Sequence, residues 1–155
     1  MVDEHYNCQC SCGEVKFAVH GRPLFRAFCH CTICQAFNGA PYADITLFRA
    51  RDVAMPNPEI VEYKTYRPPP AVQRGVCVSC GRPAVEFMDI FPMPKLVIIP
   101  SANIRDAALV PDPALHIFYN SRVSDIGDDL PKHNGYWGSQ LAFGHKLIGA
   151  ILGRK

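Results

Sequence analysis

The chain has 155 residues, 48% of them hydrophobic, and 16 basic against 14 acidic side chains leave a net charge of +2. This length fits one domain, expected over 1–155, with a core that needs no disulfide staples. The near-neutral charge argues against a nucleic-acid partner. The N-terminus carries early acidic residues and no apolar run, so we expect no secretory signal, no membrane partner and a cytoplasmic location.

The predicted elements are mainly short strands. Runs rich in Val, Ile, Phe and Tyr, several of them with period-two alternation, are bounded by Gly, Pro, Asp or Asn, as strands in a mainly antiparallel β-domain are. In chain order these runs span 15–19, 25–28, 42–48, 60–66, 85–91, 96–99 and 115–119.

Helical signal is sparse. Residues 32–38 predict one short helix that ends before Gly39, and 141–152 predict a short C-terminal helix. Gly144 and Gly149 each weaken that last helix by about 1 kcal/mol. Residues 67–70 (RPPP) predict an extended loop that leads toward Cys77.

Eight cysteines are the unusual feature of the composition, and none follows position 80. A reducing compartment disfavours a disulfide scaffold, whereas cysteines one or two residues apart can converge on one metal ion. A redox dithiol at Cys77 and Cys80 is disfavoured because no βαβ pattern surrounds them. The cysteines are Cys8, Cys10, Cys12, Cys29, Cys31, Cys34, Cys77 and Cys80.

The first and last clusters predict one structural zinc site. Cys77-Val78-Ser79-Cys80-Gly81 is a CxxCG turn, in which the glycine permits the left-handed conformation that a zinc knuckle needs. Structural zinc takes four ligands, often all cysteine. Cys10 and Cys12, which also precede a glycine, are the natural partner pair, so Cys10, Cys12, Cys77 and Cys80 are expected to close one site.

The middle cluster predicts a second metal site with an open position. Cys29, Cys31 and Cys34 can place three sulfurs on one ion, and a catalytic zinc keeps its fourth position for water or substrate. Sulfur ligands favour zinc, ahead of iron or Cu(I). Alternatively both sites are architectural, with the fourth ligand taken from Cys8, His30 or another histidine. We expect His30 to be a local hydrogen-bond partner rather than a ligand, and His116 to be a satisfied core histidine.

Together these motifs resemble those of the glutathione-dependent formaldehyde-activating enzyme family, which also includes centromere protein V. The resemblance covers about 8–133, leaving 134–155, with Trp137, as a C-terminal extension. The segments that carry it are Cys10-Ser-Cys12-Gly13, Cys29-His30-Cys31-Thr32-Ile33-Cys34, Cys77-Val78-Ser79-Cys80-Gly81, His116-Ile117 and Asp128-Asp129-Leu130-Pro131.

The resemblance implies an Mss4-like fold, an antiparallel sheet clamped by zinc. It implies that the Cys10, Cys12, Cys77 and Cys80 site is structural and that Cys29, Cys31 and Cys34 form the catalytic site. Cys8 with Cys10 is the alternative first pair. The implied activity is that of a carbon–sulfur lyase, which reversibly joins formaldehyde and glutathione to S-hydroxymethylglutathione.

The sequence therefore favours a zinc enzyme that acts on a thiol adduct. His30 is the nearest candidate to move a proton, and four arginines are candidates to hold glutathione carboxylates: Arg26, Arg49, Arg67 and Arg74. The alternative is a non-enzymatic zinc scaffold that binds another macromolecule, with self-association through the extension. A methionine-sulfoxide reductase is disfavoured, because that chemistry needs a nucleophilic cysteine late in the chain. The motifs mark a zinc scaffold and leave the substrate open.

Overall fold

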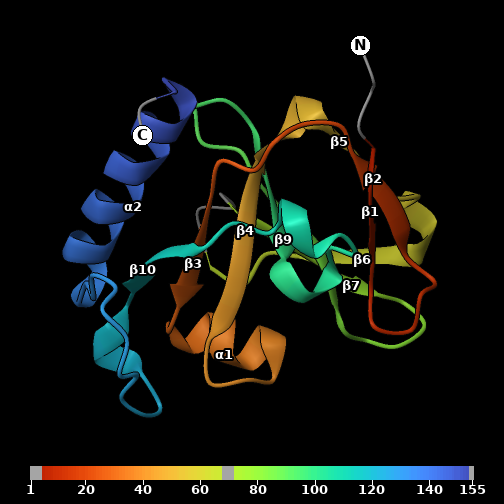
Figure 1. Ribbon diagram of the computed structural model, residues 1–155. Helices are drawn as coiled ribbons and strands as arrows, with labels where there is room; N and C mark the ends of the chain where they lie inside the picture. The colour runs from red at the N-terminus through yellow and green to blue at the C-terminus, as the bar shows by residue number, and fades with distance from the viewer. Residues whose placement is uncertain (1–4, 68–71, 154–155) are drawn as a thin grey trace.

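Strands dominate the computed structural model, which describes residues 5–67 and 72–153 (Figure 1). Residues 68–70 of the expected extended loop lie outside the described residues. The strands are β1 (Tyr6–Gln9), β2 (Lys16–Val19), β3 (Phe25–Cys29), β4 (Ala43–Arg49), β5 (Val53–Ala54), β6 (Val61–Lys64), β7 (Val72–Cys77), β8 (Pro83–Met88), β9 (Leu96–Pro100) and β10 (Pro113–Ile117). The α-helices are α1 (Thr32–Asn38) and α2 (Gly135–Ile151), and short 3-10 turns span Ala50–Asp52, Pro58–Ile60, Ser101–Asn103, Ala107–Leu109 and Tyr119–Ser121.

The strands form two sheets. The smaller has the order β1-β2-β5 and the larger the order β10-β3-β4-β9-β8-β7-β6. The mainly β fold class is thus confirmed. The expected antiparallel pairing holds for every strand pair in the described residues except one, because β10 runs parallel to β3. A parallel pair needs a long crossover connection, and most of the sheet is built between these two strands.

The larger sheet separates two apolar cores. In Figure 1, α2 lies on one side of this sheet and β1 and β2 lie on the other. Alternation along β4 sends Phe48 into the core shared with the smaller sheet, and Leu47 into the core shared with α2. Leu147 of α2 is buried in that second core, which also contains Cys29 and Cys34. Two cysteines of the middle cluster therefore belong to the same apolar core as α2.

The expected helix at 32–38 is confirmed, and Gly39 caps it in the left-handed conformation with φ 58°. The C-terminal helix is confirmed but begins at Gly135, earlier than the apolar pattern indicated, and ends at Ile151. Strands β1, β5 and β7 were not predicted. In β7 the polar Gln73 and Arg74 and the small Gly75 obscure any apolar alternation, although the strand lies inside the sheet between β6 and β8.

Candidate metal centres

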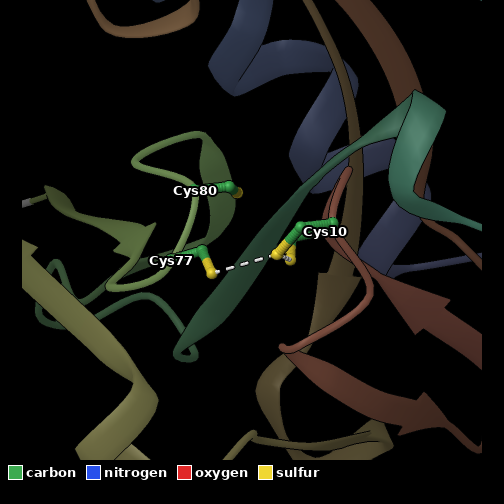
Figure 2. Close-up of side chains that lie close together, drawn as sticks. Cys10, Cys77 and Cys80 are labelled. Carbon is green, nitrogen blue, oxygen red and sulfur yellow. Dashed lines mark hydrogen bonds between the residues drawn. The ribbon is translucent and has the colours of Figure 1, made fainter.

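Two turns distant in sequence bring four cysteines together. Cys10, Cys12, Cys77 and Cys80 have their sulfur atoms within 4.8 Å of one another. In both turns a glycine follows the last cysteine with positive φ, 81° at Gly13 and 69° at Gly81. Each glycine N–H donates back to a cysteine carbonyl, Gly13 to Cys10 at 3.0 Å and Gly81 to Cys77 at 2.8 Å. Figure 2 shows Cys10 on one segment, and Cys77 and Cys80 on another.

The four sulfurs fit a tetrahedral metal ion. Zinc–sulfur bonds of about 2.3 Å place neighbouring sulfurs about 3.8 Å apart. The Cys12 sulfur lies 3.5 Å from that of Cys10 and 3.6 Å from that of Cys77. The backbone N–H of Val15 also points at the Cys10 sulfur, at 3.4 Å, so the turn is shaped to stabilise a thiolate there.

Cys8 lies outside this group, so the first pair is Cys10 and Cys12 rather than Cys8 and Cys10. Cys8 sits in β1, bridged to Ile104, and is almost fully buried. That burial raises the pKa of its thiol to about 11. Cys8 is therefore a neutral core residue.

Cys29, Cys31 and Cys34 come together where β3 turns into α1. Cys29 ends the strand, and Cys31 is the N-cap of the helix. The Cys31 sulfur accepts a hydrogen bond from the backbone N–H of Cys34 at 3.3 Å. The three sulfurs lie within 4.8 Å of one another, and no fourth Cys, His, Asp or Glu ligand atom in the described residues joins them. This cluster can hold a metal ion and leave one position open.

The three thiols are electrostatically coupled. Hydrogen bonds from the Cys29 and Cys34 side chains hold the pKa of Cys31 well below its usual value. The same contacts, first with Cys31, raise the pKa of Cys29. The protonation of each thiol therefore depends on its two neighbours.

One of the four candidate arginines contacts this cluster. Arg74 of β7 donates from Nη1 to the Cys34 sulfur at 3.8 Å and to Glu86 Oε2 at 2.9 Å. Burial of Glu86 raises the pKa of its carboxyl group, and the charge of Arg74 opposes that rise. Glu86 was not singled out from the sequence. The available signal was a lone carboxylate inside the apolar strand β8.

The other three arginines have different partners in the described part of the chain. Arg26 makes two hydrogen bonds to the Asp44 carboxylate, at 2.7 and 2.8 Å. Arg49 donates to the carbonyl of Ile151 at 3.0 Å. Arg67 stacks over the ring of Tyr136, with 5.2 Å from its guanidinium carbon to the ring centre.

His30 contacts another histidine rather than the cysteine sulfurs. Its Nε2 lies 2.8 Å from His116 Nδ1, and His116 Nε2 lies 2.8 Å from Asp128. The expected hydrogen bond of His30 is confirmed, but its partner is 86 residues away, so the contact is not local. His116 is fully buried with both ring nitrogens paired, which confirms the satisfied core histidine.

The charge on Asp128 sets the direction of the hydrogen bonds that join His30, His116 and Asp128. Lys132, and then His116, hold the pKa of Asp128 at about 2, so the carboxylate is ionised. His116 therefore donates to Asp128 from Nε2 and accepts at Nδ1 from His30. Burial lowers the pKa of His30 to about 4, and its Nδ1 has no hydrogen-bond partner among the described residues. These hydrogen bonds from His30 through His116 to Asp128 tie the middle cysteine segment to β10 and the segment after it.

Comparison with known proteins gives one family. The family model described as "Glutathione-dependent formaldehyde-activating enzyme" matches residues 5–121, which include all eight cysteines. The matched segment ends before the Asp128 motif and before α2. A search of curated proteins found no match to this chain. Within 5–67 and 72–153, no helix is long and apolar enough to span a membrane.

Proposed function

This chain belongs to the glutathione-dependent formaldehyde-activating enzyme family, and we propose that it is a zinc-dependent carbon–sulfur lyase acting on a thiol adduct. S-hydroxymethylglutathione, formed from formaldehyde and glutathione, is the proposed adduct. The observation that carries the proposal is the grouping of Cys29, Cys31 and Cys34 without a fourth ligand group among the described residues. Three protein ligands with an open position are typical of catalytic zinc sites.

The two sites have separate roles in this proposal. All-sulfur donors favour zinc, and the complete set of Cys10, Cys12, Cys77 and Cys80 suits a structural ion. Zinc held by Cys29, Cys31 and Cys34 would supply a Lewis-acidic position for the substrate sulfur. None of the eight cysteines forms a disulfide, which fits the cytoplasmic location that we propose.

The proposed reaction is an addition without a redox change. A carbon–sulfur bond forms between the thiol sulfur and the formaldehyde carbon, the thiol loses its proton, and the carbonyl oxygen gains one. The reverse reaction breaks the same bond. Cys29, Cys31 and Cys34 hold the ion, and Arg74 offsets their negative charge from 3.8 Å. His30 is engaged by His116, so in this proposal it positions the cysteine segment.

The test is the rate at which the zinc-loaded protein accelerates adduct formation above the uncatalysed rate, followed by the proton NMR signal of the adduct methylene group. Cys31→Ala should lose the acceleration. Cys8→Ala is the matched control, because Cys8 lies outside both clusters, and it should retain activity. Full acceleration by Cys31→Ala on every thiol tested would refute the proposed site.

Exposed apolar residues on α2 favour a second candidate, a non-enzymatic zinc scaffold that self-associates. Trp137 is 75% exposed and Leu141 is 71% exposed. In this alternative both cysteine clusters are structural, and α2 contacts a second copy of the chain. Gel filtration of the Trp137→Ser/Leu141→Ser double variant tests it. A monomeric wild type with the same elution volume as the variant would count against self-association.

A further inference from the structure

Arg74 is the cation in direct contact with the three-cysteine cluster. Its Nη1 lies 3.8 Å from the Cys34 sulfur, and its side chain is only 12% exposed. A charge so shielded from water interacts strongly with its neighbours, because the local dielectric constant is low. A buried cation here therefore affects the net charge that is most stable at the three-cysteine cluster, including any ligand bound there.

Two contacts from different elements hold the guanidinium of Arg74. Glu86 of β8, 2% exposed, accepts from Nη1 at 2.9 Å. Phe37 of α1 lies under the guanidinium, with 5.6 Å from its carbon to the ring centre. The second carboxylate oxygen of Glu86 is buried without a partner among the described residues. Among the described residues the Glu86 carboxylate makes one hydrogen bond, to Arg74, and this bond orients the guanidinium.

Arg74 also has N–H groups without a hydrogen-bond partner among the described residues. Both of its hydrogen bonds come from Nη1, and within the described residues neither Nε nor Nη2 makes one. The guanidinium presents five N–H groups in a fixed plane, which suits recognition of an anion. These unused donors belong to the side chain that touches the cysteine cluster.

The charge balance shows what this cation can do. Three thiolates and a divalent ion carry a net charge of about −1, and an anionic fourth ligand makes it about −2. A neutral fourth ligand leaves it unchanged. The Glu86 carboxylate offsets part of the Arg74 charge, but the guanidinium is the group that contacts a sulfur of the cluster. Its attraction therefore favours an anionic ligand over a neutral one.

We propose that Arg74, oriented by Glu86, makes the three-cysteine site select a thiolate over a neutral ligand at its open position. This inference rests on the proposed function, and it names the ionised sulfur of the substrate as the group that the site recognises. Arg74 is a positioning residue in this account, because it acts through the charge of the cluster.

The experiment uses the full chain loaded with Co²⁺, whose absorption reports its ligands. The protein is titrated at constant pH with 2-mercaptoethanol, which binds as a thiolate, and separately with imidazole, which binds neutral. The sulfur-to-cobalt charge-transfer band and the ligand-field bands give both dissociation constants. The complete four-cysteine site contributes a constant background.

The informative variant is Arg74→Gln/Glu86→Gln, which avoids leaving either charge buried alone. Its affinity for the thiol relative to imidazole should fall by about tenfold to a hundredfold, the range expected for losing one hydrogen-bonded charge contact. Arg74→Lys should retain much of the selectivity. A purely structural role for the pair would weaken both ligands equally.

Arg49→Gln is the matched control, because it removes one arginine charge at the opposite end of β4 from Ala43, the residue paired with Cys29. It should leave the ratio unchanged. Thiol binding by the wild type with the same ratio in the double variant would overturn the role of Arg74 alone. A wild type that binds neither ligand would overturn both this inference and the proposed function.

Discussion

Removing the four-cysteine site should destabilise the protein more than removing the three-cysteine site, because the two sites close loops of very different length. Cys12 and Cys77 are 65 residues apart, whereas Cys29 and Cys34 are separated by five (34 minus 29). Loop-closure entropy grows as (3/2)RT ln n, so the ratio of 65 to 5 corresponds to about 2 kcal/mol. For a chain of this size that difference lowers the unfolding midpoint by about 4–8 °C.

The chain offers a matched pair of variants for this test. Cys77→Ser/Cys80→Ser and Cys31→Ser/Cys34→Ser each remove one buried and one half-buried thiol. Thermal unfolding followed by circular dichroism, with zinc content measured for each variant, gives the two midpoints. An equal shift, or a larger one for Cys31→Ser/Cys34→Ser, would refute the loop-closure argument.

Three further predictions concern the scaffold. Phe48→Ala, which empties a fully buried position, should lower the urea-derived free energy of unfolding by about 3–5 kcal/mol, and a loss below about 1 kcal/mol would contradict that burial. Gly75→Ala should destabilise by about 1–3 kcal/mol, because its Cβ would meet Val61 at 2.6 Å and the Val85 carbonyl at 2.7 Å; Gly127→Ala, with open space around it, is the control. The pKa of Asp128 is lowered to about 2, so its stabilisation is complete above about pH 4 and disappears as the pH falls toward 2. Urea unfolding of Asp128→Asn over this range should show a weaker acid dependence than wild type, and parallel curves would count against the Asp128 contacts.

The cysteine clusters could be predicted from the sequence because their geometry is largely local. Cys10 and Cys12, or Cys77 and Cys80, are brought together by single turns whose glycines are visible in the sequence. Which turn faces which was inferred by completing a set of four ligands, and the structure groups the same four residues. The catalytic role of Cys29, Cys31 and Cys34 stays a prediction.

Contacts between distant strands could not be predicted in the same way. Arg74 was one of four equivalent arginines until strand pairing placed it opposite Glu86 and beside Cys34. The pairing of His30 with His116 depends on the parallel alignment of β10 with β3, for which the sequence carries no local signal. Strand order and direction, rather than residue type, determine these partners.

The position of α2 bears on how this protein can change during evolution. The family-model match ends at residue 121, yet Leu147 and Phe143 of α2 pack against the sheet, and the ring of Phe143 lies 5.2 Å from that of Phe25. A substitution that alters the volume of Phe25 must therefore be accommodated by α2. The family segment and the helix that follows it therefore share one packing interface, although the family match stops before the helix.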